Sequence, residues 1–84
     1  MVKILFFARL REDLGCAEED LDLPQGVATV AALQAHLVSR GGAWKDALAP
    51  GRAVRVAVNQ DMAQPGTPVK PGDEVAFFPP VTGG

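Results

Sequence analysis

The sequence has few of the side chains that most often carry chemistry in proteins. Its 84 residues include one cysteine, one histidine, one tryptophan and no tyrosine. A single cysteine excludes an internal disulfide framework and is typical of a reducing compartment. Cys16 and His36 could serve as a nucleophile and its base, but no pattern in the sequence orients one toward the other. We therefore expect both to be bystanders.

An excess of charge of either sign is also missing. Eight Lys and Arg against ten Asp and Glu give a formal net charge of −2. No basic face is expected, and nucleic-acid binding is disfavoured. Four acidic residues gather at Glu18, Glu19, Asp20 and Asp22, but they alternate across a predicted strand and lack the spacing of an EF-hand loop. We expect a solvated strand edge there and no metal site.

Long hydrophobic runs and phosphate-binding loops are absent. The apolar run near the N-terminus is too short for a signal peptide and has no cleavage site, and no stretch approaches the length of a membrane span. No glycine-rich loop leads into Lys followed by Ser or Thr, so the chain is not expected to activate a substrate with ATP by itself. We expect one small, soluble, cytoplasmic domain that binds neither membrane nor cofactor.

Alternating apolar residues predict five strands. The predicted strands cover residues 2–8, 17–23, 53–58, 62–64 and 74–78. Acidic residues in the second strand are typical of a sheet edge, whereas the first and last strands are apolar on both faces and suit the centre. The residues between the first two strands, 10–14, are expected to form a polar turn that Gly15 closes.

One main helix is predicted between the second and third strands. Thr29 has the side chain of an N-cap, and Val30, Leu33 and Leu37 share one helical face. Gly41 is expected to take the left-handed conformation after this helix. Residues 43–48 are predicted to add a second, shorter helical segment, with Trp44, Ala47 and Leu48 on its inner side.

This order of elements predicts an α+β fold. One main helix can cover one face of a mixed four- to five-stranded sheet whose first and last strands lie parallel in the middle. That arrangement is the β-grasp, or ubiquitin-like, fold. We expect a β-grasp domain over residues 1–78 and an extended C-terminal tail over residues 79–84. The predicted core residues are Ile4, Phe6, Val30, Leu33, Leu37, Val54, Val56, Val58, Val75 and Phe77.

The predicted fold leaves apolar side chains on the sheet face that the helix does not cover. If Phe6 and Phe77 face the helix, alternation along each strand turns their neighbours outward. The outward residues are Leu5, Phe7, Ala76 and Phe78. Because clustered exposed aromatic residues are typical of a partner surface, we predict a docking surface beside the tail. The alternative is that a second layer or a dimer covers this face.

The C-terminal tail is the strongest candidate for chemistry. Pro79 and Pro80 cannot donate to a β ladder, so they end the last strand. Seven of the nine glycines fall at predicted turns or helix ends, which leaves Gly83 and Gly84 without a structural role. A tail without side chains can enter a narrow slot and present the carboxylate of Gly84 to a reaction. The alternative is an ordinary frayed chain end.

Several motifs resemble one known family along essentially the whole chain. They are residues 3–8 (KILFFA), 11–12 (RE), 57–60 (AVNQ) and 72–84 (GDEVAFFPPVTGG). In these the chain is similar to the MoaD family, the small subunits of molybdopterin synthase among the ubiquitin-like sulfur carriers. A terminal Gly-Gly is common to all sulfur carriers and to ubiquitin. The combination of FFPP followed by VTGG is a much more specific motif. The agreement is weakest over residues 62–69.

The resemblance implies a sulfur-carrier cycle. A MoeB-like, E1-like adenylyltransferase would use ATP to adenylate the carboxylate of Gly84, and a sulfur donor would convert it to a thiocarboxylate. The tail would then enter a MoaE-like large subunit, which holds the catalytic residues, and donate sulfur for the molybdopterin dithiolene. The tail residues implied to bind there are Pro79, Pro80, Val81, Thr82 and Gly83. Two sulfurs per pterin imply two charged carriers, as in a heterotetramer.

The resemblance also marks Arg11 as a partner contact near the docking surface. Two alternatives stay open. The chain could carry sulfur for thiamin or for tRNA thiolation, or it could be a β-grasp interaction module whose tail is inert.

Overall fold

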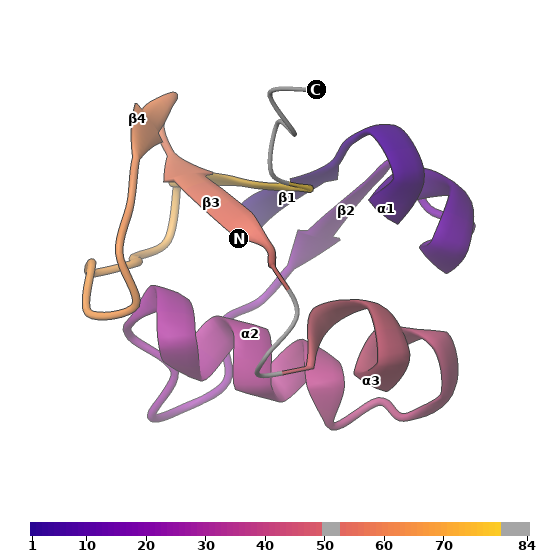
Figure 1. Ribbon diagram of the computed structural model, residues 1–84. Coiled ribbons are helices and arrows are strands. Elements are labelled where there is room, and N and C mark those ends of the chain that lie inside the picture. Colours follow the sequence, from indigo (N-terminus) through magenta and orange to yellow (C-terminus); the bar gives the residue numbers. More distant parts are fainter. Residues whose placement is uncertain (50–52, 80–84) are drawn as a thin grey trace.

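The structure, a computed structural model, describes residues 1–49 and 53–79, which contain five strands and three helices. In chain order these elements are β1 (Val2–Phe6), α1 (Ala8–Leu14), β2 (Glu18–Leu21), α2 (Val30–Val38), α3 (Gly42–Leu48), β3 (Arg55–Val58), β4 (Asp61–Met62) and β5 (Glu74–Phe78). Figure 1 shows the sheet as one layer, with α2 across one of its faces and α3 beside α2.

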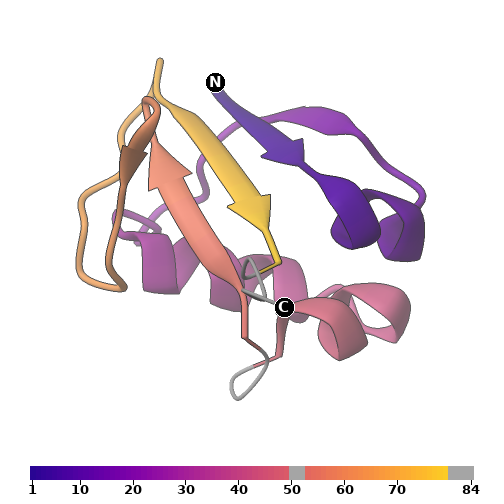
Figure 2. The same ribbon diagram turned by 45° about the horizontal axis from the view of Figure 1, so that its top comes forward.

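The five strands form a single mixed sheet in the order β2-β1-β5-β3-β4. β1 and β5 run parallel at its centre, with Ile4 opposite Val75 and Phe6 opposite Phe77. β2 and β3 flank this pair in antiparallel orientation, and β4 extends the sheet beyond β3. The parallel run of β1 and β5 can be followed in Figure 2. The predicted β-grasp arrangement is therefore confirmed.

The core lies between the sheet and α2. Ile4, Phe6, Val75 and Phe77 are buried on the inner face of the two central strands. The rings of Phe6 and Phe77 stack with their centroids 5.9 Å apart. Each such side chain contributes about 1.5–3 kcal/mol when it leaves water. Nine of the ten predicted core residues are buried, and Val54, which precedes β3, is half-buried against the core.

Helix α2 begins as the sequence predicts. The Thr29 side chain accepts a hydrogen bond from the Ala32 amide at 3.1 Å, so it satisfies a donor that the helix leaves free. The α2 residues predicted to face the core, Val30, Leu33 and Leu37, are buried. The predicted second helical segment is α3. Gly41 has the expected positive φ of 77°, but it precedes α3 as its N-cap and does not close α2, whose C-cap is Ser39.

The polar turn predicted between β1 and β2 is wrong, because residues 8–14 form helix α1. The predicted first strand also ends two residues early, since Ala8 adopts a positive φ of 52° and turns the chain into α1. Leu10 is buried in the core and Leu14 packs against it one turn later. This i, i+4 spacing of two leucines among charged residues was the helical signal in the sequence.

Arg40 joins the acidic edge strand to α3. Its guanidinium donates to both carboxylate oxygens of Glu19, at 2.8 Å from Nη1 to Oε1, and lies 4.4 Å from the ring centroid of Trp44. Trp44 in turn meets Phe6 edge-on, with 5.3 Å between ring centroids. The hydrogen bonds from Arg40 lower the pKa of the Glu19 carboxyl, and Glu19 raises the pKa of Arg40. One surface cation therefore connects β2 to the aromatic core.

A hydrogen-bonded cluster fixes the turn between β3 and β4 against the start of β5. The turn residues Asn59 and Gln60 have φ values of 50° and 71°, as a two-residue hairpin requires. The Asn59 side chain donates from Nδ2 to the Asp73 carboxylate and accepts at Oδ1 from the backbone N–H of Glu74, each at 3.0 Å. Asp73 also accepts from the Lys70 amide, and these bonds, led by that from Asn59, lower its pKa.

In residues 1–49 and 53–79, every helix is too short or too polar to cross a lipid bilayer.

The pair of Glu19 and Arg40 predicts a pH-dependent contribution to stability. Because the folded-state pKa of Glu19 is below its ordinary value of 4.5, the contribution is present above that pH and lost as the pH falls through the folded pKa. We expect Glu19→Gln to lower the free energy of unfolding by about 0.5–1 kcal/mol at pH 7, and by much less at pH 3. Urea denaturation at both values measures the difference.

The matched control for this experiment is Glu18→Gln. Glu18 lies 3.6 Å from Lys3 in a more exposed ion pair, so its loss should change stability little. An equal loss for Glu19→Gln at pH 7 and pH 3 would contradict the assignment.

The hairpin turn predicts a stabilising substitution. Gln60 pays a steric cost for its positive φ that glycine does not, so we expect Gln60→Gly to raise the free energy of unfolding by about 0.5–1 kcal/mol. Thermal or urea unfolding measures it. Gln64→Gly is the control, because Gln64 has an ordinary negative φ and should gain nothing. A loss of stability on Gln60→Gly would show that the turn is not strained.

Candidate functional site

The structure brings together the four residues predicted to face away from the main helix. Leu5 and Ala76 are neighbours across the central parallel pair, and both are half-buried. Phe78, also half-buried, ends β5 on the same face. Phe7 follows β1 directly and is 47% exposed. The predicted apolar cluster on the uncovered face is therefore present.

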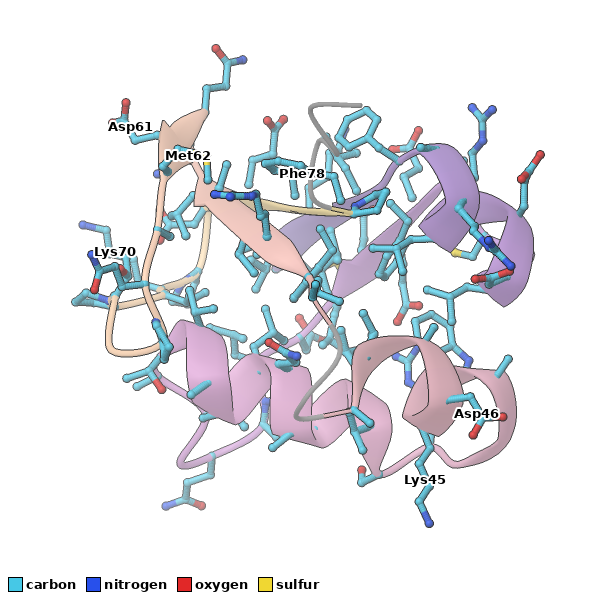
Figure 3. The ribbon with its side chains drawn as sticks, in the orientation of Figure 1. Lys45, Asp46, Asp61, Met62, Lys70 and Phe78 are labelled. Atoms are coloured by element: carbon cyan, nitrogen blue, oxygen red, sulfur yellow. The ribbon has the colours of Figure 1, made fainter. Side chains whose placement is uncertain are left out.

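The cluster extends further across the sheet than the sequence analysis predicted. Ala57 of β3, which is itself buried, lies opposite Ala76, and Met62 of β4 lies opposite Ala57. Met62 is 61% exposed. Figure 3 shows Met62 and Phe78 on the side of the sheet away from α2. We call the surface formed by Leu5, Phe7, Ala57, Met62, Ala76 and Phe78 the outer platform.

Backbone contacts hold Phe7 at the end of the outer platform. Its amide donates to the carbonyl of Phe77 at 3.1 Å, which continues the pairing of β1 with β5. Its own carbonyl accepts from the Leu10 amide in the first turn of α1. The positive φ of Ala8 then turns the chain away. Phe7 is thus fixed by its backbone while its ring stays exposed.

Arg11 lies on α1, one helical turn beyond Phe7, and is exposed. Within residues 1–49 and 53–79 it forms no ion pair. Its neighbour Arg9, by contrast, lies 3.8 Å from Asp13. The described contacts leave Arg11 available to a partner, and its predicted role stays a prediction.

The chain leaves the sheet at Pro79, the last residue that the structure describes. Pro79 is half-buried and lines a recess of about 330 Å³ together with residues of α1 and α3 and the segment before β3. The other predicted tail residues, Pro80, Val81, Thr82, Gly83 and Gly84, lie outside the described residues. The recess marks the start of the tail as a point where three elements meet.

A larger apolar groove of about 680 Å³ lies between α2 and the strands β3 and β4. Two alanines one turn apart on α2, Ala31 and Ala35, leave the space, and Val54 and Val56 line the opposite wall. Met62 belongs to both the groove and the outer platform, so the two apolar surfaces are continuous. The groove is not predicted above, although the spacing of the alanines on α2 was a signal for it.

The other chemical candidates are not brought together. Cys16 is half-buried, and its thiol donates to the Glu18 carbonyl at 3.3 Å. His36 lies on α2, and no hydrogen bond joins the two side chains within the described part of the chain. Among those residues no group of three His, Cys, Asp or Glu side chains is placed to hold a metal ion.

The mixed sheet with parallel central strands and one main helix defines a ubiquitin-like β-grasp protein. Comparison with known families is more specific, because the model of the ThiS family matches residues 4–84. The chain belongs to the ThiS family.

Two relatives match the chain along their whole length. The molybdopterin synthase sulfur carrier subunit of Haemophilus influenzae is 44% identical over 84 residues, and all of both chains is covered. The protein of the same name from Escherichia coli is 45% identical over 86 residues, again over all of both chains.

Solved structures have the same fold. The small archaeal modifier protein 1 of Haloferax volcanii has a TM-score of 0.76 and 30% identity, covering 95% of this chain and 97% of that one. A second match is a chain from the protein–protein complex of subunits 1 and 2 of the molybdopterin-converting factor from Helicobacter pylori. It has a TM-score of 0.65 and 25% identity, and the match covers 99% of this chain and 97% of that one.

Proposed function

We propose that this chain is the sulfur carrier subunit of a molybdopterin synthase. The observation that carries the proposal is the match to two proteins of that name, at 44% and 45% identity over the whole of both chains. The reacting group is the terminal carboxylate of Gly84. The chain itself is not a catalyst, and the catalytic residues belong to a large subunit.

The chemistry begins with a carboxylate, which resists attack because its charge is delocalised over two oxygens. A MoeB-like adenylyltransferase binds ATP, and a carboxylate oxygen of Gly84 attacks the α-phosphate of that ATP as pyrophosphate leaves. A sulfur donor at the oxidation state of hydrosulfide then forms a C–S bond to the carbonyl carbon of Gly84. The C–O bond to the adenylate breaks, and AMP leaves with that oxygen. The product is a thiocarboxylate, whose sulfur is the nucleophile for the pterin.

Partner docking follows from the outer platform and the tail together. Ordering the five residues beyond Pro79 costs about 1–2 kcal/mol of backbone entropy each, so a slot alone holds the tail weakly. The proline pair reduces this cost by restricting the free tail. The apolar outer platform offsets it by anchoring the folded body beside the slot. A MoaE-like large subunit is the proposed partner, in keeping with the two-subunit complex of the Helicobacter pylori factor.

The intact mass of the protein tests the reaction. After coexpression with the MoeB-like enzyme and a sulfur donor, we expect one oxygen to be replaced by sulfur at Gly84, because only the adenylated carboxylate accepts sulfur. Coexpression without the activating enzyme is the control and should give the unmodified mass. Tandem mass spectrometry of the C-terminal peptide locates the change.

An unmodified terminus in the presence of the activating enzyme would contradict the proposal. Full synthase activity after deletion of Gly84 would contradict it as well. A thiocarboxylate that supports thiamin or tRNA thiolation, with no large molybdopterin synthase subunit copurifying, would assign the carrier to another pathway.

Substitution of Phe7 tests the outer platform. We expect Phe7→Asp to weaken binding to the large subunit by tenfold or more, since it places a charge in an apolar contact. Because Phe7 is 47% exposed, stability should change by less than about 0.5 kcal/mol. Calorimetric titration and urea unfolding measure the two effects. Ala43→Asp, an exposed site on α3, is the control and should leave binding intact. Unchanged binding by Phe7→Asp would remove Phe7 from the interface.

A further inference from the structure

Arg55 is a cation at the junction of the two apolar surfaces. It lies directly opposite Phe78 in the pairing of β3 with β5, on the face that forms the outer platform. It also lines the groove between α2 and β3. Its side chain is exposed, and it forms no ion pair or side-chain hydrogen bond within residues 1–49 and 53–79.

Among the described residues, no acid is placed where it could neutralise Arg55. No other charged residue lines the groove. Glu74 stands at the opposite end of β5 from Phe78, and Asp61 pairs with the core residue Val58 at the opposite end of β3. Lys3, a described cation of β1, lies 3.6 Å from Glu18. Within the described part of the chain, Arg55 is therefore a single unpaired charge in an apolar surface.

Docking would change the environment of this charge. A partner that covers Phe78 and Met62 also takes Arg55 out of water. Arg55 lies opposite Phe78, and it lines the same groove as Met62. Removing a guanidinium from water without an opposite charge is strongly unfavourable. A purely apolar partner surface would therefore be rejected, whereas one with a carboxylate at this point would be accepted.

We propose that Arg55 is a specificity determinant of the outer platform, and that the large subunit presents an Asp or Glu carboxylate to its guanidinium within an otherwise apolar contact. The planar guanidinium suits a two-oxygen contact with a carboxylate, which fixes orientation as well as charge. The inference rests on the proposed function for the choice of partner. It goes beyond it by stating which chemistry the partner surface must have.

The fold does not depend on the Arg55 side chain. Its guanidinium has no partner among the described residues, and its position on a strand accepts a β-forming apolar residue. Arg55→Leu is therefore expected to fold with unchanged stability, which makes it a clean test of recognition.

The experiment measures binding of the full-length carrier to the large subunit by calorimetric titration at low and at physiological salt. We expect Arg55→Leu to bind about 30-fold more weakly or worse, because the partner carboxylate loses its counter-ion. Arg55→Lys should recover only part of the loss, since an ammonium cannot make the planar contact. The wild-type affinity should fall with salt more steeply than that of Arg55→Leu.

Arg9→Leu is the matched control. Arg9 is an exposed cation on α1, already 3.8 Å from Asp13 and outside the outer platform, so its loss should change the affinity by less than about twofold. In the large subunit, removal of the partner carboxylate should show strong coupling with Arg55→Leu in a double-mutant cycle, because both substitutions break the same contact.

Equal or tighter binding of Arg55→Leu would overturn the inference while leaving the proposed function in place, provided that the wild type binds and forms its thiocarboxylate. Absence of binding by the wild type, together with an unmodified Gly84, would instead overturn the proposed function, and the inference with it.

Discussion

The parallel pairing of β1 with β5 is the constraint on which the rest of the structure depends. Its register sets Phe6 beside Phe77 and Leu5 beside Ala76. Because side chains alternate along a strand, one register sends the first pair into the core and the second pair to the opposite face. A slip of either strand by one residue would turn that strand's phenylalanine out of the core and its outer-platform residue, Leu5 or Ala76, inward. The core and the proposed docking surface are therefore two results of a single pairing.

The same pairing decides what surrounds the start of the tail. β5 is a central strand, so its last residue has a strand on each side. Phe7 follows the end of β1 on one side, and Arg55 begins β3 on the other. A tail that followed an edge strand would have such neighbours on one side only. Because the tail leaves from a central strand, residues of the folded body on both sides of its start can contact the partner that the tail enters.

Much of this arrangement could be predicted from the sequence, because local patterns determine it. Thr29 caps α2 and β5 covers residues 74–78, as the patterns indicate. Helix α1 was missed because its short apolar face is Leu10 and Leu14 among charges, which also fits a turn. The contributions of Ala57, Met62 and Arg55 depend on register between strands, which no single strand encodes. Gly84 lies outside the described residues, so its role stays a prediction.

Two arginines show how the chain uses charge differently for stability and for recognition. Arg40 is paired with Glu19 and packed on Trp44, so its charge is satisfied within the fold. Arg55, on β3, has no such partner among the described residues. In the proposed cycle, the carrier binds one protein for activation and another for transfer, and it has to leave both. A charge pair within an apolar contact contributes orientation and association rate more than raw affinity. That balance suits a carrier, because an interface made tight by apolar area alone would release its partner slowly.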